Sequence, residues 1–211
     1  MSMEFSFVFS APNIFNLAHT LYNISSKLEP LGLHHERDVS FADFGKLENE
    51  TPSVLFDAFM NGEGANWNAC SIEFYAERIW LNVVLDKRRS EFLNIYVDTN
   101  LNTILRNREH GKLPLYINAL LEIARATQSV IGTGNYDFAQ EMVSPDELLN
   151  CILNNPDNLG FPTDLGIIKI SAMKKETVEA LFSKSFRIAE RAGYWLLIGL
   201  DLEQLVRDLS E

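Results

Sequence analysis

The chain of 211 residues contains little cysteine and none of the motifs that most often mark a metal site. Its two cysteines, Cys70 and Cys151, lie in apolar stretches, so we expect two buried free thiols and no disulfide framework. No HExxH, HxH or paired CxxC pattern occurs. The usual sequence signatures of a zinc site are therefore missing.

Long apolar runs are missing as well. The longest run, around residues 194–200, is far shorter than the ~18 residues that a membrane-spanning helix needs. The sequence starts without a basic segment followed by a long apolar one, the pattern of a secretory signal. We expect a soluble cytoplasmic protein that does not bind membranes.

Basic residues are outnumbered, with 18 Lys and Arg against 29 Asp and Glu, for a formal net charge of −11. Binding to phosphate backbones or anionic lipid draws on clustered Lys and Arg, so nucleic acid is not an expected partner. The charge is uneven along the chain. Residues 1–66 carry 3 basic and 9 acidic side chains, residues 67–112 carry 7 and 6, and residues 113–211 carry 8 and 14. A nearly neutral middle segment thus lies between two acidic flanks.

The composition is that of a folded protein, because 46% of the residues are hydrophobic and 22% are charged. A chain of this length buries roughly 70% of its unfolded surface, enough for a sizeable core. No repeat, low-complexity tract or evident linker divides the sequence. We predict one domain over residues 1–211, with a division into 1–143 and 144–211 as the alternative.

The first part of the chain predicts a strand followed by a helix. Phe5, Phe7 and Phe9 alternate with small polar residues, as expected for a half-buried strand. Apolar residues then recur at helical spacing from Ile14 to Leu28, and Pro30 ends the pattern. Residues 32–64 are irregular and predict loops around one short element at 54–60.

The clearest strand pattern covers residues 70–98. Apolar and polar residues alternate in three runs separated by short polar links, which predicts an antiparallel three-stranded meander. One face is aliphatic. The other mixes aromatic, amide and carboxylate side chains.

The second half of the chain predicts helices and strands in turn. A helix is expected from Ile117 to Ile131, with Gly132 as its left-handed cap. Ser144 and Glu147 form the pattern of a capping box at the start of another helix. The glycine-containing stretches at 62–64 and 132–135 lack the Gly-Lys-Ser/Thr ending of a phosphate loop, so they favour turns or caps.

The last third predicts a strand at 166–171, a helix at 174–192 capped by Gly193, and a strand at 194–200. Such an order suits a right-handed β-α-β crossover. The final strand is apolar without alternation, as expected for a strand that is covered on both faces. The predicted fold is therefore α+β, with a mixed, largely antiparallel sheet that contains the meander and the β-α-β unit, and with helices packed on the sheet.

The densest group of metal-ligating residue types is His34, His35, Glu36 and Asp38. Imidazole and carboxylate groups bind transition metals, but a site needs three or four ligands that converge on one point. Adjacent residues of an extended chain point to opposite sides, so His34 and His35 would not readily bind one ion. A solvated polar loop is favoured, with a metal site as the alternative, and we expect no cofactor.

The mixed face of the meander is the candidate binding site. Aromatic residues combine large buried area with a polar group, and aromatics beside amides and carboxylates are typical of protein interfaces. The alternative is that a helix packs on this face. The candidate residues are Glu73, Tyr75, Trp80, Asn82, Asn94, Tyr96 and Asp98.

Three functions are open. The favoured hypothesis is a non-catalytic protein-binding or inhibitor protein whose acidic surface meets a basic protein partner through the mixed face or through acidic residues around 48–63. In this character the chain is similar to the immunity proteins that neutralise bacterial toxins, although it shares no motif with them. The alternatives are a metal-assisted hydrolase that uses the His34–Asp38 cluster, and a structural homo-oligomer that pairs the strand at 194–200 or the meander edge with another copy.

Overall fold

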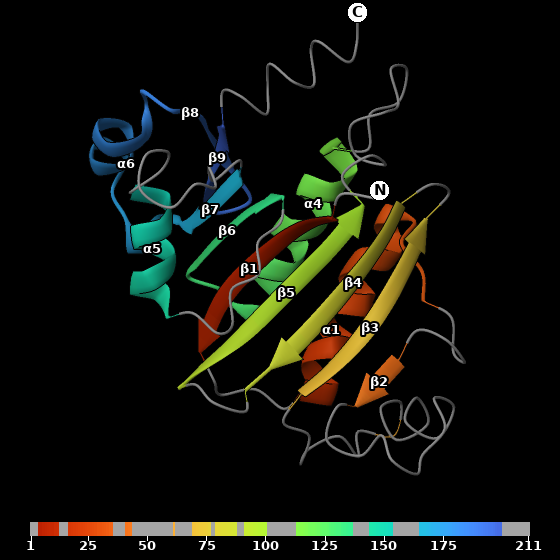
Figure 1. Cartoon of the computed structure of the whole chain (residues 1–211). Coiled ribbons are helices and arrows are strands. Elements are labelled where there is room, and N and C mark those ends of the chain that lie inside the picture. Colours follow the sequence, from red (N-terminus) through yellow and green to blue (C-terminus); the bar gives the residue numbers. More distant parts are fainter. Residues whose placement is uncertain are drawn as a thin grey trace, which may run out of the picture.

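The protein has an α+β fold in which one antiparallel sheet is packed by helices (Figure 1). The computed structural model describes residues 4–12, 17–35, 41–43, 61, 69–76, 79–87, 91–100, 113–136, 144–153 and 165–199. The strands are β1 (Glu4–Pro12), β2 (Phe41–Asp43), β3 (Ala69–Ala76), β4 (Ile79–Asp86), β5 (Phe92–Asn100), β6 (Ile131–Tyr136), β7 (Leu165–Lys169), β8 (Phe186–Arg191) and β9 (Tyr194–Gly199). The helices are α1 (Leu17–Leu28), α4 (Leu113–Thr127), α5 (Pro145–Leu153) and α6 (Lys175–Phe182). Two short 3-10 turns, η1 (Glu29–Leu31) and η3 (Ile170–Ala172), complete the described elements.

In the described residues the sheet has nine strands in the order β2-β3-β4-β5-β1-β6-β7-β9-β8. All of the neighbouring pairs are antiparallel, so the predicted mixed sheet is wrong in its parallel part. The first strand of the chain lies near the middle, between β5 and β6. The pairing of β6 with β7 continues the sheet across the boundary at residue 143 that the sequence suggested as an alternative division.

The larger core lies between one face of the sheet and the helices α1 and α4. We call this side the helix face. Phe5, Phe7 and Phe9 of β1 point into it and are fully or almost fully buried. The apolar residues of α1 that the sequence predicted on one stripe, Leu17, Leu21 and Leu28, are buried against it, and Cys70 is a buried free thiol there.

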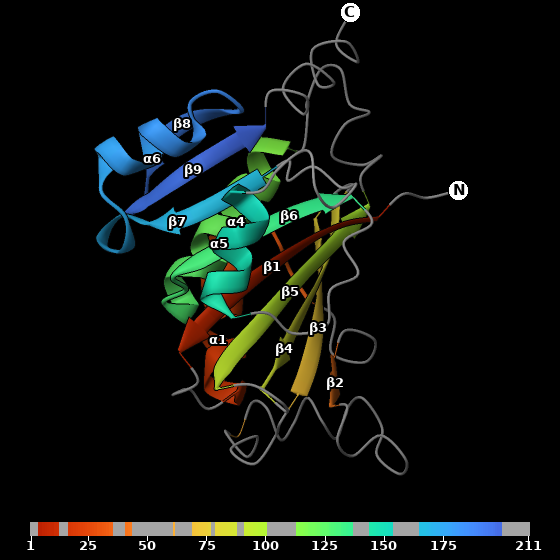
Figure 2. The same cartoon turned by 60° about the vertical axis from the view of Figure 1, so that its left-hand side comes forward.

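A smaller core lies on the opposite, outer face of the sheet. It joins Val8 of β1 to Ile131 of β6, and it includes residues from α5 and α6. Trp195 of β9 belongs to this core, while its neighbour Leu196 belongs to the larger one. The expectation that the strand at 194–200 is covered on both faces is therefore confirmed for β9. Figure 2 shows α5 and α6 beside the C-terminal half of the sheet.

The end of α4 corrects one sequence prediction. The helix ends at Thr127 instead of continuing to Ile131, and Gln128, with φ 54°, takes the left-handed position expected of Gly132. Gly132 lies within β6, opposite Phe9. A Cβ atom there would come within 3.0 Å of the rings of Phe7 and Phe9, so the glycine allows the two rings to pack across β6. The stretch 132–135 is therefore a strand rather than a turn.

The capping box of α5 is confirmed. The backbone N–H of Ser144 donates to Glu147 Oε2 over 2.7 Å, and the backbone N–H of Glu147 donates to Ser144 Oγ over 3.3 Å. The Ser144 backbone N–H and the Ser144 hydroxyl both donate to Glu147 Oε2, and they lower the pKa of the Glu147 carboxyl because they favour its charged form. Local sequence chemistry alone positions this helix start.

The C-terminal unit corrects a second prediction. The predicted helix at 174–192 is a shorter helix, α6, followed by the strand β8. β8 and β9 form a hairpin whose two central residues, Ala192 and Gly193, both have positive φ. Since β9 pairs antiparallel with β7, no right-handed β-α-β crossover exists here. Phe186 and Ile188 alternate with Arg187 and Ala189. This period of two is that of a strand and differs from the period of a helix.

Several predictions lie outside the described residues, namely the element at 54–60, the metal candidates Glu36 and Asp38, and most of the acidic segment at 48–63. Across the helices that the structure describes, none has the length and apolar character required to cross a bilayer.

Candidate functional site

The candidate site is the outer face of β3, β4 and β5, where these strands pair antiparallel in sequence order. We call it the β3–β5 face. Figures 1 and 2 show α1 and α4 on the opposite side of these strands, and α5 and α6 beside the far half of the sheet. No helix among the described residues therefore packs on the centre of this face. The residues of the face, by position along each strand, are Ser71, Glu73, Tyr75, Trp80, Asn82, Val84, Asp86, Phe92, Asn94, Tyr96 and Asp98.

A polar row crosses the middle of the β3–β5 face. Glu73 lies opposite Asn82, and Asn82 lies opposite Asp98. All three side chains are half-buried. Because neighbouring strands lie about 4.8 Å apart, the two carboxylate-bearing residues are separated by about 10 Å at the backbone, with an amide between them. At this spacing the two carboxylates would reach one metal ion only if both side chains extended far toward each other. The spacing does suit a flat cationic group that lies over Asn82.

Aromatic side chains border the polar row on both sides. Tyr75 and Trp80 are directly opposed on one side, and Tyr96 occupies the next row on the other. The Tyr75 hydroxyl donates a hydrogen bond to Glu73 Oε2, which fixes that carboxylate beside the phenol ring. Tyr96 also packs against the smaller core, and this contact holds part of its side chain in place. The sequence predicted this set of residues on one face, and the register places them in adjacent rows.

The opposite end of the face is closed. Asp86, Asn94 and Ser10 lie in one cross-strand row, and they are 7%, 0% and 0% exposed. Asn94 is thus placed on the predicted face but is not accessible to a partner. The accessible part of the predicted set is Glu73, Tyr75, Trp80, Asn82, Tyr96 and Asp98.

The charge of the face has one sign. Its described positions carry the carboxylates of Glu73, Asp86 and Asp98 and no Lys or Arg. Tyr116 of α4 lies close to Asp98, because its hydroxyl donates a hydrogen bond to the carbonyl oxygen of the preceding residue, Val97. Burial raises the pKa of Tyr116 well above its ordinary value, and the carboxylate of Asp98 adds to this effect.

Sequence reasoning missed the contribution of β1. Ser6 lies opposite Asp98 and Val8 lies opposite Tyr96, so β1 extends the rows of the β3–β5 face. The alternation of Ser6 with Phe5 and Phe7 identified the outward side of this strand. Its place beside β5 could not be deduced, because about 90 residues separate the two strands in the chain.

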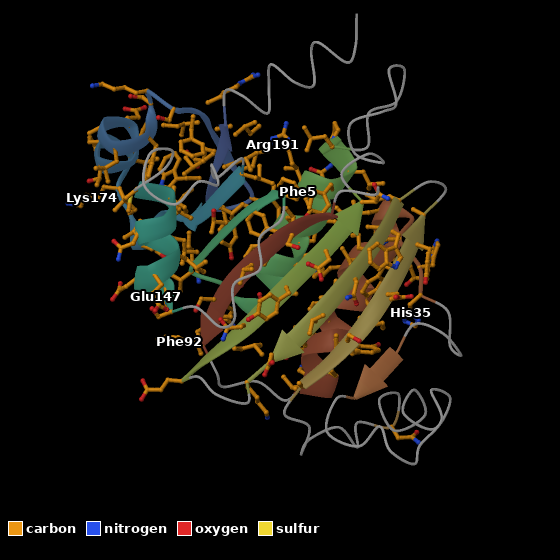
Figure 3. The ribbon with its side chains drawn as sticks, viewed as in Figure 1. Phe5, His35, Phe92, Glu147, Lys174 and Arg191 are labelled. Atoms are coloured by element: carbon orange, nitrogen blue, oxygen red, sulfur yellow. The ribbon has the colours of Figure 1, made fainter. Side chains whose placement is uncertain are left out.

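The histidines lie at the far margin of β3. His34 is exposed and forms an isolated bridge, in which its backbone N–H and C=O bond to Tyr75. His35 is half-buried, and its ring meets Phe74 edge to face at 5.8 Å between centroids. Burial lowers the pKa of His35. Figure 3 shows His35 beside β3, on the opposite side of the molecule from Lys174.

The described part of the chain holds no group of three or more His, Cys, Asp or Glu side chains placed to bind a metal ion. The bridge with Tyr75 instead gives the segment of His34 a structural role, since it pairs the backbone of β3 beyond the short strand β2.

Comparisons with known proteins give limited similarity. No family model matches the chain, and neither does any curated protein sequence. Among solved structures, the chain is similar to Pseudomonas aeruginosa T6SS protein PA0821, with a TM-score of 0.45, 11% identity and coverage of 93% of this chain and 64% of the other. The Trypanosoma brucei AdoMetDC-delta26 monomer gives a TM-score of 0.30, 10% identity and coverage of 93% and 63%. The chain thus spans less than two thirds of each of these proteins, and neither similarity assigns it a function.

Proposed function

We propose that the protein is a non-catalytic binding protein whose β3–β5 face holds a basic segment of a partner protein. The observation that carries the proposal is the register. It brings Glu73 and Asp98 into one row over Asn82, with the opposed pair Tyr75 and Trp80 beside it, on a face that no described helix covers.

The chemistry of this row fits an arginine or lysine side chain. A guanidinium lying over Asn82 donates hydrogen bonds toward carboxylates on both sides, and charge-assisted bonds of this kind are stronger than neutral ones. Aromatic rings next to the row provide cation–π attraction and apolar area for the aliphatic part of the side chain. The net charge of −11 adds long-range attraction for a basic partner.

The same geometry serves an inhibitor. A protein that covers a basic surface of its partner blocks whatever that surface would otherwise bind, which would neutralise a partner that acts through that surface. The proposal therefore includes the inhibitor function that the acidic composition suggested.

The alternative functions receive less support. In the described residues, the histidine cluster offers one exposed and one half-buried imidazole without a third ligand. The strand at 194–200, proposed for pairing between copies, is β9, which lies between β7 and β8 and so has no open edge. β9 therefore offers no edge to another copy, and the meander edge, the other element proposed for such pairing, is partly covered by β2. For the hydrolase, the described residues supply no third ligand beside the two histidines.

The test uses the full chain and a capped ten-residue peptide in which Arg alternates with Thr. Isothermal titration calorimetry should detect binding that weakens as salt is raised, because the attraction is between opposite charges. Trp80→Ala and the double variant Glu73→Gln/Asp98→Asn should each lower the affinity about tenfold or more. A peptide with Glu in place of Arg tests the sign of the charge, because Trp80→Ala and Glu73→Gln/Asp98→Asn should not weaken any binding that this peptide shows.

The matched control is Tyr22→Ala, which removes an aromatic side chain that is 55% exposed on α1, away from the β3–β5 face. This variant should bind the Arg peptide as the unchanged protein does. Equal binding by the Trp80 and Tyr22 variants, or no binding of the Arg peptide at low salt, overturns the proposal.

A further inference from the structure

The strand β8 ends the sheet on the side away from β2. Among the described strands its one neighbour is β9, so its second backbone edge has no strand paired to it. An edge of this kind presents a row of N–H and C=O groups that can accept a further strand. β8 is six residues long, which is long enough for such pairing, and half of its residues are exposed.

The charge of this part of the molecule is opposite to that of the whole. Residues 165–199 carry 6 Lys and Arg and 3 Glu, in a chain with a net charge of −11. Arg187 and Arg191 are exposed and lie four positions apart on β8, so both lie on the helix face, as does Tyr194 opposite Arg191. The three acidic residues of this range are Glu176 and Glu179 on α6, and Glu190 on the outer face of β8.

Two further cationic side chains, those of Lys169 and Arg125, lie near Arg191. Lys169 of β7 and Arg191 of β8 both lie opposite Tyr194, and directly opposed residues of antiparallel strands share a face. Arg125 of α4 lies close by, since the Tyr194 hydroxyl bonds to the neighbouring Ala124 carbonyl. Arg125 also pairs with Glu122 over 2.7 Å, so its charge is partly compensated. Figure 3 shows Arg191 on the side of β9 that faces α4.

We propose that β8 is a docking edge for an extended acidic segment of another protein, which adds to the sheet as a further strand and places carboxylates opposite Arg187 and Arg191. Arg187 and Arg191 are four positions apart, which is about 13 Å along a strand. A segment with acidic residues at alternate positions presents carboxylates at this spacing on one face.

A second copy of the chain fits this edge poorly. In the two-fold antiparallel register centred on Ala189, Arg187 would lie opposite Arg191 of the other copy, and directly opposed like charges destabilise a sheet. A nucleic acid fits poorly too. Binding through a few cationic side chains would release few of its counterions, and the acidic remainder of the protein would repel its phosphates. A short acidic segment avoids both difficulties.

The experiment titrates the full chain with a capped ten-residue peptide in which Glu alternates with Thr. Binding should fall about tenfold or more in Arg187→Glu/Arg191→Glu, since both contacts become repulsive. Two substitutions of Lys to Glu at Lys174 and Lys175, which are exposed on the same unit but away from the edge, make the same change in net charge. This control should leave the affinity within about twofold.

Backbone pairing is tested separately from charge. The same Glu peptide with every second amide N-methylated retains its carboxylates but cannot complete the strand hydrogen bonds, so it should bind about tenfold more weakly or not at all. Equal affinity of the methylated peptide overturns strand addition. Binding of a duplex DNA that depends equally on Arg187 and Arg191 overturns the choice of an acidic protein segment, and no binding of the Glu peptide at low salt overturns the proposal altogether. None of these outcomes depends on the β3–β5 face, which the Arg peptide tests.

Discussion

The hydroxyl of Tyr194 donates a hydrogen bond to the carbonyl oxygen of Ala124, 2.9 Å away and 70 positions earlier in the chain. It ties β9 to the last turn of α4, where the Ala124 carbonyl oxygen also accepts the backbone N–H of Ser129 over 2.9 Å. Burial raises the pKa of Tyr194 to about 12, against the nearby Arg125 guanidinium, which lowers it. One side chain therefore links the C-terminal unit to the larger core.

Replacing this tyrosine by phenylalanine should lower the free energy of unfolding by about 1 kcal/mol at pH 7, the usual value of a buried neutral hydrogen bond. The substitution should also change the alkaline response. Below pH 10 the tyrosine is neutral in both states. Between pH 10 and about 12 it ionises first in the unfolded chain, so the unchanged protein loses stability there.

Denaturant unfolding at pH 8, 10 and 11 checks the prediction. In Tyr194→Phe the decrease above pH 10 should be smaller, with a remainder due to Tyr116, whose pKa is also raised. An identical decrease in the two proteins would show that Tyr194 is not the titrating group.

Gly132→Ala should destabilise the protein by about 1–3 kcal/mol, because the added methyl group overpacks a core whose rings cannot move aside. Phe7 and Phe9 are both fully buried, and their ring centroids are 4.6 Å apart. Gly166→Ala in the adjacent strand β7 is the control, since its nearest neighbour is the flexible side chain of Leu197 at 3.2 Å. Thermal melts of the two variants should differ clearly, with Gly132→Ala lower.

Ala192→Asn should stabilise the β8–β9 hairpin by about 0.5–1 kcal/mol. The φ angle of 53° at Ala192 is unfavourable for alanine, whereas asparagine adopts it more readily. Gly193→Ala, at φ 85°, should instead cost about 1 kcal/mol. Unfolding midpoints that move in the same direction for both variants would contradict a two-residue turn with positive φ at both positions.

Ser144→Ala should return the pKa of Glu147 toward its ordinary value, because the hydroxyl contact is lost and the N-terminal turn of α5 loosens. The depressed pKa of the folded state contributes stability above the unfolded value, and this contribution disappears as the pH falls through the folded value. The variant should therefore lose less stability on acidification. Carboxyl chemical shifts of Glu147 between pH 2 and 6 measure the change directly, and an unchanged titration curve would refute it.

Trp80 and Trp195 should respond differently to truncation. Trp195 is 5% exposed and its indole N–H donates to the carbonyl oxygen of Met173 over 2.8 Å, so Trp195→Ala should cost about 3–5 kcal/mol. Trp80 is half-buried on the β3–β5 face, and Trp80→Ala should cost about 1 kcal/mol, the range of a cross-strand pair. Urea unfolding of both variants gives the comparison. A cost for Trp80 as large as that for Trp195 would mean that this face is packed as core.

The elements that could be predicted from sequence are those fixed by local chemistry. Two examples depend only on residues close together in the chain. One is the strand alternation of Phe5, Phe7 and Phe9, and the other is the capping pair Ser144 and Glu147. The residues of the β3–β5 face could be assigned to one side by parity alone. Their grouping into rows needed only the short links between consecutive strands.

The elements that could not be predicted depend on distant contacts. Gly132 resembles a helix cap locally, but the rings of Phe7 and Phe9 on another strand decide its conformation. The segment after Phe182 has enough alanine and charge to suggest a continuing helix. Pairing with β9 makes it a strand, and the Ala192-Gly193 turn sets that pairing. Propensity is a weak guide wherever tertiary contacts of this kind are available.

The central position of β1 constrains the order in which the strands can pair while the chain is being synthesised. Phe7 pairs with Val97 on one side and with Gly134 on the other, so β1 cannot complete its pairing until residues near 100 and then near 136 have been synthesised. Until then the N–H and C=O groups on both backbone edges of β1 have no strand to pair with, and closing loops over such separations is slow. The two ladders at the centre of the sheet therefore form only after β2, β3 and β4 have been made.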